Sequence, residues 1–202
     1  MVAPMTNDEV EILHMVKTNR GIVTSTQVTE AGIPRRCLGT MVQSGMLYRV
    51  ERGVYTLPKT WKDELYVLQW RFSRGIFSHE TALYLHGMTD RTPMRYTMTF
   101  PFGYNTSNVR KRGVVAKVAS EKTYPLGIMT LSSPNGNPIQ AYDIERTLCE
   151  MVKTRHKADI QVVNQAMRIY AGSRDKDIAK LMDYAEALRV KPKVLTYMQI
   201  LL

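Results

Sequence analysis

The sequence lacks the features that would mark a secreted or membrane-bound protein. It has only two cysteines, Cys37 and Cys149, and both lie within apolar helical patterns far apart in the chain, so reduced packing thiols are expected. No apolar run approaches the roughly 18 residues that a membrane-spanning helix needs. Residues 1–13 have no basic segment ahead of an apolar stretch, as a secretory signal would. We therefore expect a cytoplasmic globular protein.

Acidic residues are also scarce. The chain of 202 residues has 18 Asp and Glu against 28 Lys and Arg, which gives a formal charge of +10 and a pI near 9.7. A protein this basic attracts polyanions, so nucleic acid is the first partner to consider. The hydrophobic share of 44% is ordinary for a soluble protein, and the length allows one good core or two small ones.

The signals of common catalytic sites are missing or weak. There is no glycine-rich phosphate loop, and His79 and His86 do not have the His-x-x-x-His spacing of a helical zinc site. Asp143, Glu145 and Arg146 could form a nuclease or phosphotransfer cluster. An N-cap aspartate followed by an acid in the first helical turn is the simpler interpretation, with Arg146 bridging back to a strand. We predict no enzyme, no metal site and no cofactor.

What the sequence does contain is a helix-turn-helix pattern with a hairpin, over residues 20–57. Thr6 followed by acids predicts a first helix to about residue 18, and Thr24 or Ser25 begins a short second helix that ends near residue 31. Gly32 supplies the turn, and Pro34 suits the start of a third helix.

The third helix divides into two faces when its residues are placed about 100° apart. The polar face consists of Arg35, Arg36, Gly39, Thr40 and Gln43. The apolar face consists of Cys37, Leu38, Met41, Val42 and Gly45. The apolar face is expected to pack on the first helix, which leaves the polar face for phosphates or base edges in a major groove.

Residues 46–57 alternate in polarity around Glu51-Arg52-Gly53, which predicts a hairpin and hence the wing of a winged helix-turn-helix. The candidate DNA-binding residues in this domain are Thr24, Thr26, Arg35, Arg36, Gly39, Thr40, Gln43, Arg49 and Arg52. The plainer alternative is a small helical domain whose arginines are merely solvated. Residues 1–60 carry seven basic and five acidic residues, so this domain supplies only +2.

The rest of the formal net charge, +8, comes from residues 61–202. One basic cluster is Arg110, Lys111 and Arg112 with Lys117 and Lys122. A later cluster comprises Arg146, Lys153, Arg155, Lys157, Arg168, Arg174 and Lys176. We expect Arg110, Lys111 and Arg112 to share the DNA, because added phosphate contacts strengthen binding without adding sequence information. A docking face for an acidic partner, an RNA surface, or scattered solvated charges are the alternatives.

The second domain is expected to be α+β. Helices are predicted at 61–72 and 78–86, the second capped by Ser78 and closed by Gly87. Strands are predicted at 96–100, 114–119, 128–131 and 139–142, and later helices at 144–154, 159–171, 176–187 and 192–202. Asp143 and Ser173 are the expected N-caps of two of these helices. The predicted architecture is thus an N-terminal winged helix-turn-helix at 1–60, followed at 61–202 by an α+β domain with a small sheet and a helical C-terminal tail.

Together with the winged helix, two segments resemble the AbiEi antitoxins of abortive-infection AbiE systems. These are the SHExAL-like segment that begins at Ser78 and the ERTL-like segment that begins at Glu145. The resemblance covers nearly the whole chain. It implies a bacterial type IV antitoxin that binds inverted repeats in its own promoter, represses transcription, and protects against phage spread.

The partners implied by the resemblance are double-stranded promoter DNA and a nucleotidyltransferase-like toxin, which is counteracted without a stable complex. We expect a monomer in solution and two copies on the inverted repeat. Two alternatives remain open. One is an enzyme that modifies the toxin or its RNA substrate through the C-terminal domain, and the other is a regulator with an unrelated effector domain.

Overall fold

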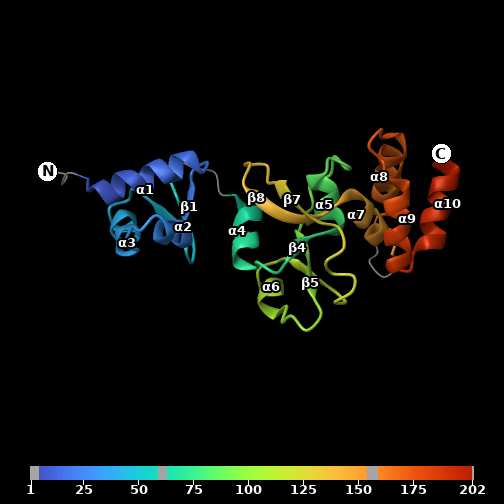
Figure 1. The fold of residues 1–202 in the computed structure, drawn as a ribbon, viewed down its shortest axis with the longest axis horizontal. Coiled ribbons are helices and arrows are strands. Elements are labelled where there is room, and N and C mark those ends of the chain that lie inside the picture. Colours follow the sequence, from blue (N-terminus) through green and yellow to red (C-terminus); the bar gives the residue numbers. More distant parts are fainter. Residues whose placement is uncertain (1–4, 59–62, 154–158, 202) are drawn as a thin grey trace. The chain divides into compact units, whose positions relative to one another are not determined.

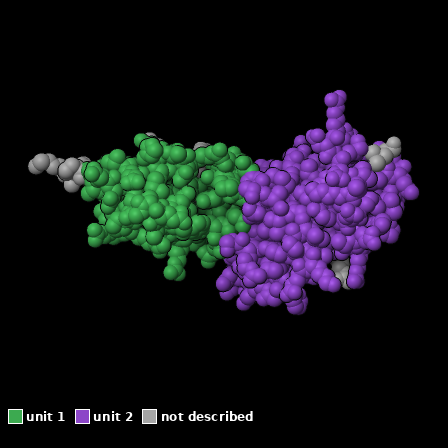
Figure 2. Space-filling view, in the orientation of Figure 1, with its two compact units in different colours: residues 1–71, 132–139 green, residues 72–131, 140–202 purple. Residues whose placement is uncertain are grey.

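A computed structural model describes residues 5–58, 63–153 and 159–201 of the chain. The chain forms two compact units (Figure 2), the first made of residues 1–71 and 132–139, and the second of residues 72–131 and 140–202. The predicted domain boundary between residues 60 and 61 falls in 59–62, outside the described residues.

The first unit is a winged helix (Figure 1). Its helices are α1 (Asn7–Thr18), α2 (Ser25–Glu30), α3 (Arg36–Gln43) and α4 (Glu64–Arg71). Its strands are β1 (Ile22–Thr24), β2 (Tyr48–Glu51) and β3 (Val54–Thr56), in the order β1-β3-β2. The predicted hairpin is confirmed, since β2 and β3 pair antiparallel. The third strand, β1, escaped prediction because three residues are too few to show a period-two alternation.

Two capping boxes fix where the first helices begin. The Thr6 hydroxyl accepts a hydrogen bond from the amide of Glu9, whose carboxylate accepts one from the Thr6 amide. Thr24 and Gln27 repeat this exchange at α2. Each box satisfies amide groups that the first helical turn leaves without an intrahelical partner. The core beneath consists of Ile12, Val16, Val23, Val28, Ile33, Leu38, Met41 and Leu47.

The second unit is built on a mixed five-stranded sheet in the order β6-β5-β4-β8-β7. These strands are β4 (Ile76–Phe77), β5 (Thr97–Pro101), β6 (Val115–Ala119), β7 (Ile128–Ser132) and β8 (Pro138–Tyr142). β4 lies antiparallel to β5 and parallel to β8, and β5 lies parallel to β6. The four predicted strands are confirmed. The two-residue β4 and the short helix α6 (Ser107–Lys111) were not predicted.

The other helices of this unit are α5 (His79–Leu85), α7 (Ile144–Met151), α8 (Ile160–Gly172), α9 (Ile178–Ala187) and α10 (Lys191–Leu201). Asp143 caps α7 as predicted, since its carboxylate accepts from the Arg146 amide. The prediction for Ser173 is wrong: Ser173 ends α8, and Asp177 caps α9. An aspartate four residues downstream competes for the same role, and its carboxylate is the better partner for the helix dipole.

Two further predictions concern helix starts. Ser78 occupies the N-cap position of α5 without a capping hydrogen bond, because its hydroxyl accepts from the Thr99 hydroxyl at 2.8 Å instead. Of the helix predicted at 61–72, residues 61 and 62 lie outside the described residues, Asp63 is not helical, and α4 covers Glu64–Arg71. Within the described residues, no helix is long and apolar enough to cross a membrane.

Asp63 joins the start of α4 to residues 132–139 within the first unit. Its side chain is buried, and its carboxylate accepts hydrogen bonds from the Tyr66 amide, the Ser133 hydroxyl and the Asn137 side-chain amide at 3.0, 2.5 and 2.7 Å. These three donors satisfy the oxygens of a buried carboxylate, which offsets the cost of removing it from water. This polar contact therefore joins residues 132–139 to the start of α4.

We expect Asp63→Ala to lower the free energy of unfolding by about 2–4 kcal/mol, because it leaves buried donors without an acceptor. Urea unfolding followed by circular dichroism would measure the change. Asp63→Asn is the matched control, since it keeps one acceptor oxygen and should lose less. Equal unfolding midpoints for wild type and Asp63→Ala would show that the carboxylate does not stabilise this unit.

Candidate nucleic-acid interface

The third helix of the first unit, α3, has the two faces that the sequence predicts. Its five polar-face residues are exposed. They are Arg35, Arg36, Gly39, Thr40 and Gln43. On the opposite face, Leu38 and Met41 are buried against Ile12 and Val16 of α1. The predicted division is confirmed, except that Gly45 lies beyond the end of the helix and is exposed.

The polar face is partly preorganised. The Arg35 Nε group donates a hydrogen bond to the Thr29 hydroxyl on α2 at 2.7 Å, which ties the start of α3 to the preceding helix. A Cβ atom added at Gly39 would meet nothing within 4 Å, so the middle of this face is open. An open glycine flanked by exposed arginine and threonine side chains allows close approach of a phosphate backbone.

The wing presents cations and is anchored at its turn. Arg49 and Arg52 are exposed, and Gly53 adopts a φ of +80° that favours glycine. Glu51 forms an ion pair with Arg71 of α4 at 2.7 Å, and the Trp70 indole donates to the Arg52 carbonyl oxygen at 3.3 Å. α4 thus holds the turn of the wing while both arginine side chains remain at the surface.

The two threonines predicted to bind DNA differ in their surroundings. Thr24 is buried, and its hydroxyl is used in the capping box of α2. Thr26 is exposed in the first turn of the same helix. The role that the local structure supports for Thr24 is therefore internal, whereas Thr26 is accessible to a ligand.

The basic run of the second unit lies on and just after α6. Arg110 and Lys111 form the last turn of this helix, Arg112 is its C-cap, and all three are exposed. Val109 is buried and fixes the helix to its unit. Lys117 and Lys122, which the sequence places in the same cluster, instead line a cavity of the second unit. Arg155 and Lys157 of the later cluster lie outside the described residues.

The SHExAL-like and ERTL-like segments meet inside the second unit. His79 Nδ1 lies 3.3 Å from a carboxylate oxygen of Glu150, and Nε and Nη2 of Arg146 donate to that carboxylate at 3.3 and 3.1 Å. All three side chains are buried. Arg146 therefore pairs with an acid one helical turn away on α7, not with a strand as the sequence suggested. Glu150 was missed because its partners come from segments about 70 residues apart.

Asp143 and Glu145 do not face this network. Lys180 of α9 lies 2.8 Å from Asp143 and 3.3 Å from Glu145, and the Tyr170 hydroxyl donates to Glu145 at 3.2 Å. Both carboxylates are thus neutralised by contacts that join α7 to α8 and α9. This supports the interpretation of Asp143 as a helix cap rather than as part of a catalytic cluster.

His79, the first residue of α5, and His86, its C-cap, both have structural partners. His86 Nε2 donates to the Tyr142 carbonyl oxygen at 2.7 Å. Burial of the imidazole, together with the charges of Lys117, Arg146 and Lys153, lowers the pKa of His79 to about 3. These effects outweigh the nearby Glu150 carboxylate, whose charge Arg146 already balances. Within the described part of the chain, no group of three or more His, Cys, Asp or Glu residues could hold a metal ion.

Residues 11–58 match the model of a protein family described as transcriptional regulator, AbiEi antitoxin. Among solved structures, the chain is similar to the RV2827C protein from Mycobacterium tuberculosis, with a TM-score of 0.52 and 12% identity over 98% of this chain and 83% of that one. No curated protein matches the chain in sequence. The expected resemblance to AbiEi antitoxins is confirmed for residues 11–58, which form the winged helix, and the structural likeness shows a shared α+β fold.

We expect the His79 imidazole to stay neutral at every pH above about 5. Because its pKa is lower in the folded state than the ordinary value near 6.5, its contribution to stability is complete above pH 6.5 and is lost as the pH falls toward 3. The wild type should lose up to about 1.4 kcal/mol per pH unit more than His79→Asn in that window. Asparagine suits the φ of +53° at this position.

Chemical unfolding at several pH values would measure this difference, and an NMR titration of the imidazole protons would test the neutral state directly. A midpoint between pH 6 and 7 for His79 would contradict the expected state of the network.

Proposed function

Residues 11–58 carry an AbiEi-type regulator domain, and on this premise we propose that the chain is a cytoplasmic type IV antitoxin that also represses its own promoter. The single observation that supports DNA binding best is the exposed polar face of α3, beside a wing that presents two arginines. A recognition helix and a wing are the two elements by which a winged helix-turn-helix contacts the duplex.

In this proposal α3 enters the major groove. Arg35, Arg36 and Gln43 have the donor groups for base edges and phosphates, and Thr40 has a hydroxyl that can do either. The wing residues Arg49 and Arg52 contact the backbone or the minor groove. Thr26, which is exposed in the first turn of α2, would bond a phosphate. Two copies would occupy an inverted repeat, each on one half-site, from a protein that is a monomer in solution.

The second unit contributes affinity in the same proposal. The domain of residues 1–60 has a net charge of only +2, which releases few counterions on binding. Arg110, Lys111 and Arg112 on α6 are exposed and compact enough to neutralise several phosphates. Contacts of this kind raise affinity for all sequences, while α3 supplies the preference for one sequence.

The antitoxin role is proposed on the family match, and its target is a nucleotidyltransferase-like toxin that it counteracts without a stable complex. Antitoxin activity would lie in the second unit, so variants of α3 should separate the two roles. Co-expression with the neighbouring toxin gene in growing cells tests this part, and unrelieved growth arrest would leave only a DNA-binding regulator.

We expect Arg35→Ala combined with Arg36→Ala to abolish specific operator binding in a gel-shift assay and to leave toxin neutralisation intact. Two lost contacts of about 1–3 kcal/mol each would weaken binding by at least roughly 30-fold. For a matched comparison of single charges, Arg36→Ala should weaken binding far more than Lys17→Ala, which removes an exposed cation from α1. Unchanged operator affinity of the double variant would disprove the assignment of α3 as the recognition helix.

We expect the triple change of Arg110, Lys111 and Arg112 to alanine to weaken binding to operator and unrelated DNA by similar factors. The slope of log K against log salt should fall in magnitude by about 2–3, because each lost phosphate contact removes about 0.9 released counterions. Fluorescence anisotropy at several salt concentrations measures both quantities. A slope equal to that of the wild type would place the DNA on the first unit alone.

A further inference from the structure

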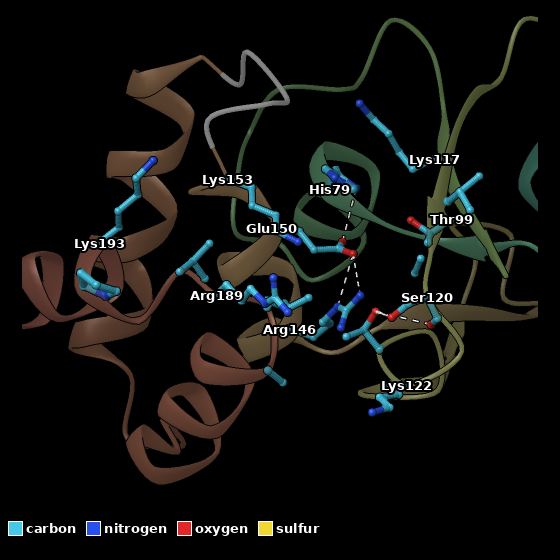
Figure 3. A pocket seen from close by; sticks show the side chains of 17 residues that line it. His79, Thr99, Lys117, Ser120, Lys122, Arg146, Glu150, Lys153, Arg189 and Lys193 are labelled. Atoms are coloured by element: carbon cyan, nitrogen blue, oxygen red, sulfur yellow. Dashed lines mark hydrogen bonds and ion pairs between the residues drawn. The ribbon is translucent and has the colours of Figure 1, made fainter. Parts of the chain in front are cut away.

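The second unit contains a cavity of about 990 Å³ that the proposed DNA binding does not use (Figure 3). It lies between the outer strand β6 with its following loop and the helical layer of α7 and α10. Its volume is at the upper end of the range for sites that hold small organic ligands. All its lining residues belong to the second unit.

The lining is strongly basic. Its cations are Lys117, Lys122, Arg146, Lys153, Arg189 and Lys193. Among the described residues of the lining, the only acid is Glu150, whose carboxylate is already paired with Arg146. Figure 3 shows Lys117 and Lys122 on the sheet side and Arg189 and Lys193 on the helical side, with Arg146 and Glu150 between them. Cations that converge from both sides raise the local potential for a multivalent anion.

Arg146 gives this cavity a feature that a solvated basic surface lacks. Its side chain is only 1% exposed, and in the described part of the chain its Nη1 group has no hydrogen-bond partner. Nε and Nη2 are used by Glu150, and the guanidinium lies 4.7 Å above the ring of Tyr142. A buried guanidinium donor without an acceptor costs free energy unless a ligand supplies one. A phosphate oxygen is the acceptor that best fits its geometry.

Part of the remaining wall is apolar, beside the hydroxyl groups of Thr99, Ser120 and Thr123. The apolar part includes Val118 and Ala119 on β6, Leu188 and Val190 between α9 and α10, and Pro192 in the first turn of α10. Inorganic phosphate alone would leave the apolar part of the lining exposed to water, whereas an organic group attached to phosphates would cover it. The lining therefore combines a site for several phosphates with a site for a small apolar or planar group.

We propose that this cavity binds a small organic polyphosphate, of which a nucleoside triphosphate is the representative probe. The two phosphate-rich alternatives are a free polyphosphate and a nucleic-acid strand. A nucleic-acid strand fits less well, because its phosphates continue along an open surface. The Nη1 group of Arg146 is buried and suits a terminal phosphate. The inference does not depend on the antitoxin or repressor roles proposed above.

Electrostatics around His79 support the same site. Lys117 and Lys153 both lower the pKa of this histidine, so both cations act at the position where Arg146 and Glu150 meet. The neutral imidazole adds no charge of its own. Lys117 and Lys153 are therefore the best residues to change, because neither belongs to the buried Arg146–Glu150 pair.

Isothermal titration calorimetry of the full chain with ATP, tripolyphosphate and AMP at physiological salt tests the proposal. We expect ATP to bind, tripolyphosphate to bind more weakly because it leaves the apolar wall uncovered, and AMP to bind at least about tenfold more weakly than ATP because it carries fewer phosphates. Lys117→Gln combined with Lys153→Gln should weaken ATP binding by at least about tenfold. The matched control is Lys17→Gln combined with Lys176→Gln, which removes the same charge outside the cavity and should keep wild-type affinity.

Three results would overturn the proposal. They are no heat of binding with ATP at millimolar concentration, equal losses in the two double variants, or tighter binding of a 12-nucleotide RNA than of ATP that the cavity variant abolishes. Thermal melts must show that both double variants fold. A gel shift with operator DNA keeps the two proposals separate, because the cavity variant should still bind the operator if α3 is the recognition helix.

Discussion

A buried guanidinium imposes the constraint on which the second unit depends. The charge of Arg146 must be balanced inside the protein, and Glu150 does this from the next turn of α7. That pairing requires α7 to begin at a fixed place, which Asp143 secures as its N-cap. Close approach at the same point requires Gly127, because a Cβ atom there would come within 2.8 Å of the Arg146 Cβ. The Arg146–Glu150 ion pair therefore depends on the position of α7, on its N-cap Asp143, and on Gly127 in the loop before β7.

Much of the fold could be predicted from the sequence because it depends on local signals. Thr6, Thr24 and Asp143 are capping residues whose partners lie three positions away, and the faces of α3 follow from helical periodicity. The contacts that were missed depend on distance along the chain. β4 exists only because its two residues pair with β5 and β8, which come later in the chain, and the contact between Glu150 and His79 joins residues about 70 positions apart. A single sequence has no local signal for either contact.

The basic residues of the second unit form two separate groups rather than one surface. From the sequence, an excess of +8 predicts an extended basic surface. In the structure, part of that excess lines a cavity, and the exposed run on α6 is a separate group. Net charge reports how many cations a domain has, but only the fold determines which of them face the same ligand. Two anionic partners of different size are thus compatible with one basic domain.

The position of β6 at the edge of its sheet has a consequence for solubility. An outer strand offers unpaired backbone groups to which another chain could add, and such edges are a common start of aggregation. β6 has only five residues, and Lys117 lies at its centre. A charged side chain in the middle of a short edge strand discourages intermolecular pairing, because a stacked copy would bring two lysines together. Lys117 therefore both lines the cavity and opposes the addition of another chain to β6.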